Sequence, residues 1–258
     1  MTPKKRQDLT VLIALAIFAV LASLVLHATF LVSTFLFLGL PSIYLSFRAR
    51  VKRKETFLAV LVFGGLYSFL LDYAAELNGA WAWKPEQLIF KTKILGVVSP
   101  DSIIWTMLWI LFLVLFYEHF LERDRKDTYS NRVWYAIVVG LGLLGAFVWF
   151  STFYPTVVAV QHAYFFYGLC TLPPFLFAIY KRPALLPKLL KAAAFFIPLY
   201  LAYELTGRYL GQWDFPGHYF GMIQILGITF PLEEFMFWIC GSSVITLAGY
   251  EFLIDDMK

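Results

Sequence analysis

Apolar runs of about 18–20 residues recur along the chain, and each is long enough to cross roughly 30 Å of membrane hydrocarbon. The sequence of 258 residues is 60% hydrophobic and 15% charged, whereas a soluble domain is about 45–50% apolar and about 25% charged. The composition therefore excludes a water-soluble globule. Because the runs lack alternating polarity, we expect membrane-spanning helices.

These runs predict eight spans. They cover residues 9–27, 29–47, 56–77, 103–121, 133–154, 156–180, 189–205 and 233–253. The first run is long, and no small-residue cleavage site follows it ahead of a polar mature domain, so we expect it to remain as a helix. The sequence thus predicts an all-α integral membrane protein with eight transmembrane helices.

Basic residues are unevenly divided between the two sides that eight spans define. With both termini on one side, that side holds 17 of the 21 Lys and Arg residues. The other side keeps Lys84, Lys91, Lys93 and Arg208. Because cytoplasmic segments carry the excess of Lys and Arg, we expect a plasma-membrane protein with both termini in the cytoplasm. We assign the basic clusters to contact with anionic membrane lipid and not with nucleic acid.

Three sequence segments recur in the same order, about 131–133 residues apart. Residues 72–83 (DYAAELNGAWAW) resemble residues 204–215 (ELTGRYLGQWDF), which pairs Asp72 with Glu204, Trp81 with Trp213 and Trp83 with Phe215. Residues 94–105 and 225–236 share Ile-Leu-Gly and then proline, and Tyr117-Glu118 matches Tyr250-Glu251. We therefore predict an internal repeat.

Four spans in each half make the two halves cross the membrane in the same direction. The expected architecture is two parallel four-helix repeats, residues 1–127 and 128–258, related by a pseudo-two-fold axis along the membrane normal, with a site where they meet. Segments 78–102 and 206–229 are too apolar and aromatic for solvated loops. We expect both segments to fold back against the helix ends.

Glu233 and Glu234 follow Pro231 at the start of the last span. Proline and acids in the first turn are ordinary features of a helix start, but acids near the membrane core are costly and indicate function. Residues four apart share a helix side, so we expect Glu234 beside Trp238 and Glu233 beside Phe237. Burial keeps a carboxylic acid protonated, and aromatic faces stabilise a cation. This pattern favours protonation of a poor base such as an alkene.

Residues 211–238, GQWDFPGHYFGMIQILGITFPLEEFMFW, resemble the signature segment of the membrane-embedded lycopene cyclases. These enzymes occur as heterodimeric subunits in some bacteria and as fused domains in archaea and fungi. The family carries Pro-x-Glu-(Glu/Asp) after a Trp-x-Phe-like segment, and here the matching residues are Pro231, Glu233, Glu234, Trp213 and Phe215. The resemblance is specific from about residue 188 to 251 and weaker from about 72 to 120.

The resemblance implies a redox-neutral isomerase that acts on lycopene or a related acyclic carotenoid without a cofactor. Such enzymes protonate a terminal double bond and close a β-ionone ring. Carried over, Glu233 and Glu234 become the candidate acid and base, and Glu204 and Asp72 are further catalytic candidates. The candidate substrate-binding residues are Trp213, Phe215, Trp81, Trp83, Phe237 and Trp238.

The first half departs from the family pattern. It reads Pro100-Asp101-Ser102-Ile103, so both glutamate positions of the motif are lost. Either one half carries all the chemistry, or the protein performs a related reaction such as carotenoid hydration. Polyene binding without chemistry and transport are further alternatives, although the first-half spans offer few acids beyond Asp72 and Glu76 for a proton-coupled carrier. Homo-oligomerisation is left open.

Other signals indicate packing. GLGLLG (140–145) matches a dinucleotide fingerprint but lies inside a span, where small residues allow close helix packing, so we predict no flavin or nicotinamide site. We predict no metal site and a packing role for Cys170 and Cys240. Among the histidines, His162 and His218 are the better candidates for site residues. Aromatic residues inside spans suit a polyene: Trp105, Trp109, Trp149, Tyr164, Phe166 and Phe195.

Overall fold

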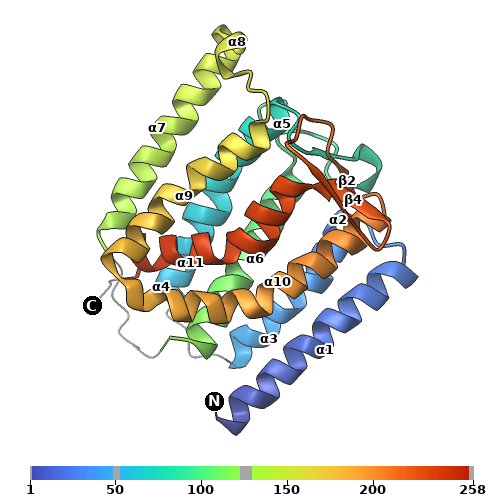
Figure 1. The fold of residues 1–258 in the computed structure, drawn as a ribbon, viewed down its shortest axis with the longest axis vertical. Coiled ribbons are helices and arrows are strands. Elements are labelled where there is room, and N and C mark those ends of the chain that lie inside the picture. Colours follow the sequence, from blue (N-terminus) through green and yellow to red (C-terminus); the bar gives the residue numbers. More distant parts are fainter. Residues whose placement is uncertain (1, 49–52, 123–129, 256–258) are drawn as a thin grey trace.

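The computed structural model describes residues 2–48, 53–122 and 130–255. Within these ranges the protein is predominantly helical, and eight helices are long and apolar enough to cross a membrane (Figure 1). They are Pro3–Val25, Phe30–Arg48, Lys54–Leu77, Pro100–Phe120, Arg132–Phe153, Ala163–Lys181, Pro183–Tyr209 and Glu234–Leu253. The predicted all-α membrane fold with eight spans is confirmed.

Several spans are composites of consecutive helical elements. The first half contains α1 (Pro3–Val25), α2 (Phe30–Thr34), η1 (Phe35–Gly39), α3 (Leu40–Arg48), α4 (Arg53–Ala59), η2 (Val60–Tyr67), α5 (Ser68–Leu77), β1 (Ala82–Trp83), η3 (Pro85–Gln87) and α6 (Pro100–Phe120). The second half contains α7 (Arg132–Phe153), α8 (Pro155–Val158), α9 (Ala163–Lys181), η4 (Pro183–Leu185), α10 (Leu186–Tyr209), β2 (Trp213–Asp214), β3 (Met222–Ile225), β4 (Ile228–Pro231), η5 (Glu234–Gly241) and α11 (Ser242–Leu253).

Two helix starts differ from the sequence expectation for local reasons. The first helix begins at Pro3 instead of residue 9, because the Thr2 hydroxyl caps the Lys5 amide at 3.3 Å and proline suits the first turn. The sixth span was expected from residue 156, but α9 begins at Ala163. The short helix α8 ends before His162, whose left-handed φ of 52° breaks the run.

The two aromatic segments fold back against the helix ends as expected. β1 pairs antiparallel with β2, with Ala82 opposite Asp214 and Trp83 opposite Trp213. The Phe30 ring at the start of α2 lies 4.3 Å from the Trp83 ring. These contacts bring residues of both halves together over one end of the bundle.

Pairs of corresponding residues contact each other reciprocally. The Tyr117 hydroxyl donates to Glu251, and the Tyr250 hydroxyl donates to Glu118 Oε1 at 2.7 Å. Ala82 and Asp214, which face each other in the strand pair, are 132 residues apart. A two-fold relation between two halves predicts contacts of this reciprocal form.

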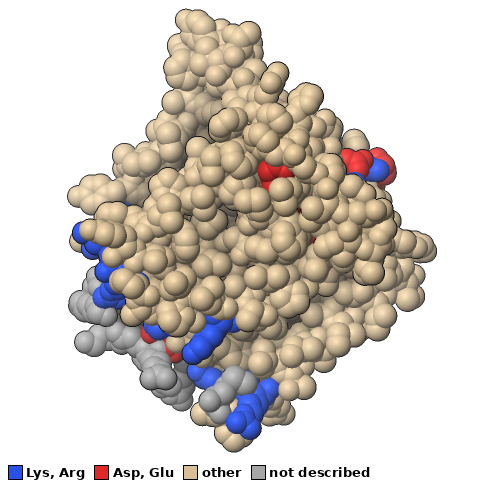
Figure 2. All heavy atoms as spheres, in the orientation of Figure 1, with Lys and Arg blue, Asp and Glu red and all other residues tan. Residues whose placement is uncertain are grey.

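Charged side chains are concentrated at one end of the molecule. Figure 2 shows most Lys and Arg side chains at the lower left and bottom of the view, the end at which Figure 1 places both termini. This distribution follows the sequence prediction, while the cytoplasmic orientation itself stays a prediction. Six residues of the predicted basic side lie outside the described residues: Arg50, Lys52, Arg123, Arg125, Lys126 and Lys258.

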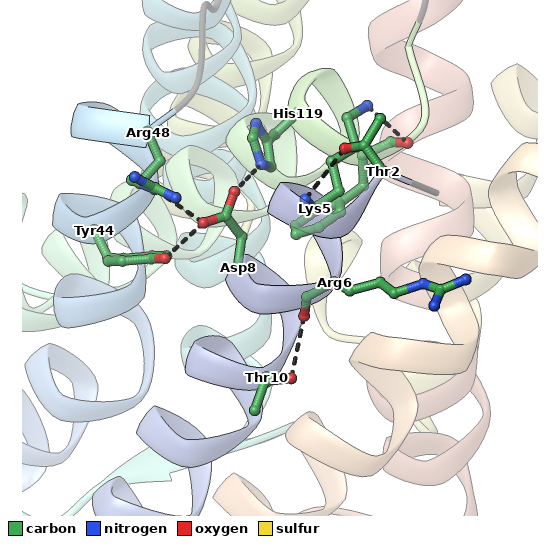
Figure 3. Close-up of polar contacts among 9 residues, drawn as sticks. Thr2, Lys5, Arg6, Asp8, Thr10, Tyr44, Arg48 and His119 are labelled. Atoms are coloured by element: carbon green, nitrogen blue, oxygen red, sulfur yellow. Dashed lines mark hydrogen bonds and ion pairs between the residues drawn. The ribbon is translucent and has the colours of Figure 1, made fainter.

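Asp8 anchors α1 at this basic end. It is fully buried, and its Oδ1 accepts hydrogen bonds from Tyr44 Oη at 2.7 Å and from Arg48 Nε at 2.9 Å (Figure 3). Its Oδ2 lies 2.9 Å from Nε2 of His119 on α6. A buried carboxylate is tolerated when it is paired and hydrogen-bonded. The cluster therefore ties α1 to α3 and α6.

The predicted packing roles of small residues hold in part. A Cβ on Gly140 would lie 2.8 Å from the Leu66 side chain, so this glycine allows α7 to approach η2 closely. A Cβ on Gly142 or Gly145 would meet no atom within 4 Å. These two glycines therefore make no close helix contact within the described part of the chain. Cys240 is partly buried but Cys170 is exposed, so the packing role predicted for Cys170 is wrong.

Candidate active site

A cavity of about 160 Å³ lies between the two halves, beneath the β1–β2 pair. Nine of the ten candidate site residues line it: Asp72, Trp81, Trp83, Glu204, Trp213, Phe215, Glu234, Phe237 and Trp238. They come from α5, α10, η5 and the segments around the strands. The remaining candidate, Glu233, does not line the cavity.

Glu204 and Glu234 form a pair of buried acids in the cavity wall. Their carboxyl groups lie close enough to interact with each other. Tyr164 of α9 donates to Glu234, and the Trp213 indole donates to Glu204 Oε1 at 3.2 Å. Two carboxyl groups that share a buried site cannot both be charged without a large cost in free energy. The pair is therefore suited to hold a proton inside an aromatic cavity.

Asp72 is the acid that α5 of the first half contributes to the same cavity. It is buried beside Ser102, Trp81 and Glu76. Its Oδ2 has no hydrogen-bond partner within the described part of the chain, whereas Glu76 is bound by Lys93 at 2.9 Å. Asp72 thus adds a third buried acid to the cavity wall, with one carboxyl oxygen that is covered and has no hydrogen-bond partner among the described residues.

Glu233 turns away from the cavity and holds the backbone. Its Oε1 accepts a hydrogen bond from the Phe220 amide at 2.7 Å. In the first half, Asp101 accepts from the amides of Ile89 and Phe90 at 2.8 and 3.0 Å. Ile89 and Phe220 are 131 residues apart, which is the repeat spacing. Asp101 and Glu233 therefore brace corresponding amides in the two halves.

Trp238 of η5 is the centre of the aromatic wall. Its ring lies 4.9 Å from both Trp105 and Trp109 of α6, and 4.8 Å from Tyr200 of α10. Trp105 in turn lies 5.8 Å from Trp83, so rings of both halves form one continuous lining. Such faces stabilise a developing positive charge in a site that contains little water.

The hydroxyl groups of the cavity are already engaged with the backbone. Four of them donate to main-chain carbonyls at 2.5 to 2.8 Å: Ser68, Thr106, Thr171 and Ser242. An ordered buried water needs two to four polar partners. The protons of these four hydroxyl groups are therefore used, whereas the indole N–H groups of Trp81, Trp83 and Trp105 have no hydrogen-bond partner among the described residues.

Some aromatic residues suggested by the sequence lie elsewhere. Trp149 and Phe166 are exposed on the helix surface, and Phe195 stacks on Phe116 at 4.6 Å. His162 stacks on Phe220 at 4.3 Å and does not line the cavity, and neither does His218. Three aromatic residues that line the cavity were given no role by the sequence interpretation: Phe30, Tyr167 and Tyr203.

Asp214 fixes the strand pair above the cavity. Burial alone would raise the pKa of its carboxyl, but hydrogen bonds from Arg208 and Lys84 outweigh burial and hold that pKa below its usual value. The Asp214 carboxylate lies 2.6 Å from Arg208 and 3.1 Å from Lys84. The Arg208 guanidinium also donates to the Trp213 carbonyl. These bonds keep Trp213 against the cavity.

Comparison of the chain with protein-family models, with curated proteins and with solved structures finds no match. The geometry of the cavity and the sequence resemblance therefore carry the functional interpretation. The site combines a pair of neighbouring buried acids, a separate acid and a continuous aromatic wall.

Proposed function

We propose that the protein is a carotenoid end-group cyclase of the lycopene β-cyclase type, which closes a ring by redox-neutral, proton-initiated chemistry. The observation that carries the proposal is the Glu204–Glu234 pair in a cavity walled by aromatic rings. This arrangement supplies a proton and a cation-stabilising surface at one place. It agrees with the resemblance of residues 211–238 to the lycopene cyclases.

The size of the cavity suits the end of a polyene. Ligand pockets that enclose a whole small molecule are roughly 300–1,000 Å³, whereas this cavity is about 160 Å³. One end group of an acyclic carotenoid would enter the cavity, and the rest of the chain would remain between helices or in lipid. A bicyclic product would then require two separate binding events.

In the proposed reaction, the Glu204–Glu234 pair delivers a proton to the terminal double bond of the end group. The resulting tertiary cation is attacked by the inner double bond, which forms the carbon–carbon bond of a six-membered ring. Asp72 removes a proton from the ring and so leaves a ring double bond. One proton is added and one is lost, so the product is an isomer of the substrate.

The engaged hydroxyl groups favour cyclisation over hydration. A hydratase must hold a water molecule next to the cation, but Ser68, Thr106 and Thr171 direct their protons to backbone carbonyls. A cation that meets no water is quenched by loss of a proton. Asp72 lines the same cavity, and in its ionised form it is the candidate base for that step.

The test is carotenoid analysis of lycopene-accumulating bacteria that express the protein, with a parallel reaction of membranes in D₂O. We expect monocyclic or bicyclic carotenes that carry one deuterium for each ring formed. Hydroxylated acyclic products would replace the proposal with a hydratase. Unchanged lycopene, with the protein folded in the membrane, would exclude both activities on this substrate.

A further inference from the structure

Two leucines at turns adopt a backbone conformation that is unfavourable for leucine. Leu95 and Leu226 both have a left-handed φ of 51°, and each is followed by a glycine with positive φ. Bulky residues are rare in this region, which favours Gly, Asn and Asp. The β3–β4 turn, between paired Ile225 and Ile228, is the two-residue hairpin in which Asn-Gly is the preferred sequence.

The same two leucines are prominently exposed. Leu95 is 57% exposed and Leu226 is 88% exposed, the highest value among the exposed large hydrophobic residues of the described chain. Each leucine therefore combines an unfavourable backbone conformation with a largely exposed apolar side chain. The combination occurs twice, at positions 131 residues apart that correspond in the repeat.

Exposed apolar side chains lie next to both tips, together with the exposed Lys91 and Lys93 near Leu95. Ile94 is exposed beside Leu95, and Phe220 and Met222 are exposed on the segment that carries Leu226. In Figure 1 the β3–β4 hairpin lies at the outer edge of the bundle, beside the end of α10, away from the basic end. Figure 2 shows a broad central surface without charged side chains, with only small charged groups at the upper right of the view.

We propose that Leu95 and Leu226 insert into the interfacial region of the bilayer, on the side opposite the basic cluster. A helical membrane protein already has lipid at its outer surface, and an apolar side chain beside that surface gains free energy by entering it. Lipid contact therefore compensates for the unfavourable turn conformation of both leucines. The inference is independent of the reaction proposed for the cavity.

The test measures membrane depth by spin labelling in phosphatidylcholine–phosphatidylglycerol bilayers. Leu95→Cys and Leu226→Cys are labelled in a background in which Cys170 and Cys240 are replaced by serine. Glu86→Cys, on an exposed turn of the same side, is the water-facing control. We expect both tip labels to collide with lipid-soluble oxygen several-fold more often than with a water-soluble nickel chelate. The control label is expected to show the reverse ratio.

Two outcomes of this experiment would overturn the proposal. Tip labels that favour the nickel chelate would place the turns in water. Labels shielded from both quenchers would indicate contact with protein, such as a second copy of the chain.

A second measurement is the change in melting temperature, which should have opposite signs if the turns lie in lipid or in water. In the Leu95→Asn/Leu226→Asn variant, asparagine suits the left-handed turn better than leucine does. If the turns lay in water, the substitution would raise the melting temperature in bilayers. We expect it to fall, because two polar side chains replace lipid-inserted ones. Glu86→Asn is the matched control and should leave the melting temperature unchanged.

Discussion

Ile103 of the first half and Glu234 of the second occupy corresponding places, each three residues after the proline of its motif. Asp101, two residues before Ile103, accepts a hydrogen bond from the Ile89 amide. Glu233, one residue before Glu234, accepts one from the corresponding amide of Phe220. Both halves thus keep the acid that holds the loop, and only the second keeps the acid that faces the cavity. The degenerate motif has lost a chemical group while its structural brace remains.

Asp72 and Glu204 extend this comparison. They correspond in the repeat and line the same cavity. Glu204 has a second acid, Glu234, beside it, whereas the place that corresponds to Glu234 is taken by Ile103 in the first half. The second half therefore presents a pair of interacting acids to the cavity, and the first half presents a single acid. This asymmetry favours donation from the second half and acceptance by the first.

The largest expected effect comes from Glu234→Gln, which removes the cavity acid of the second half. Because the shared proton is lost while the shape is kept, ring formation should fall by about 10²–10⁴-fold. The measurement is cyclic carotene formed per amount of folded protein in lycopene-accumulating cells. Ile103→Gln, at the corresponding place of the first half, is the control and should retain most activity. Equal losses in both variants would contradict the asymmetry.

Asp72→Asn should have the next largest effect, at most about 10²-fold, because other groups can remove a proton from a cation more easily than they can protonate an alkene. Its partner variant is Glu204→Gln, which disrupts the donor pair and should resemble Glu234→Gln. Both are measured as cyclic carotene per folded protein. An Asp72→Asn enzyme less active than the Glu204→Gln enzyme would reverse the assignment of donor and acceptor.

Glu233→Gln and Asp101→Asn should affect stability more than chemistry. Each replaces a carboxyl acceptor with a neutral amide oxygen, which weakens the hydrogen bond to a partly buried backbone amide by about 1 kcal/mol. We expect both to lower the melting temperature in detergent by similar amounts while activity per folded molecule is largely kept. The two-halves comparison fails if Glu233→Gln abolishes activity without a change in melting temperature, because Glu233 would then act in the chemistry.

Tyr117→Phe and Tyr250→Phe sharpen the comparison at the opposite end of the bundle. Each deletes one of the two reciprocal tyrosine–glutamate hydrogen bonds. A two-fold relation predicts equal losses of about 1 kcal/mol each, seen as similar decreases in melting temperature. Tyr135→Phe, on an exposed tyrosine of α7, is the control. Strongly unequal losses would show that the two contacts differ in environment despite their matching partners.

The smallest expected effect concerns the ion pairs of Asp214. The folded-state pKa of this carboxyl lies below its unfolded value, so its stabilisation is present above the unfolded pKa of about 3.9 and is lost as pH falls through the folded pKa. The wild type should therefore lose slightly more stability than Asp214→Asn when pH decreases from 6 to 3. Identical pH profiles of melting temperature would show that these exposed pairs add nothing.

The spans and most of the cavity were predictable because their signals are local. Apolar runs fix the helices, and the segments around Trp81 and Trp213 carry enough aromatic residues to indicate a shared wall. The direction of Glu233 was not predictable. A four-residue spacing places it beside Phe237, but Glu234–Gly241 forms a π-helix with a wider turn. Phe237 reaches the cavity, and Glu233 meets the Phe220 amide instead.

Contacts between distant segments were also beyond the sequence. Tyr164 donates to Glu234 from 70 residues away, and nothing around Tyr164 in the chain indicates that partner. The break at His162 was missed because a left-handed residue interrupts an otherwise apolar run. A hydropathy average depends on composition and not on backbone conformation. It therefore predicts the positions of helix starts less accurately than the presence of a span.

The reciprocal contacts of Tyr117 and Tyr250 have an evolutionary consequence. Two separate identical chains can make contacts of this kind, because each surface is complementary to its own copy. A present-day single chain with such contacts resembles a fused dimer in which one member carries the cavity acid Glu234 and the other carries Ile103 in its place. The gene could then be divided between Glu122 and Ser130, and the two fragments, made as separate polypeptides, should recognise each other without the peptide that joins them.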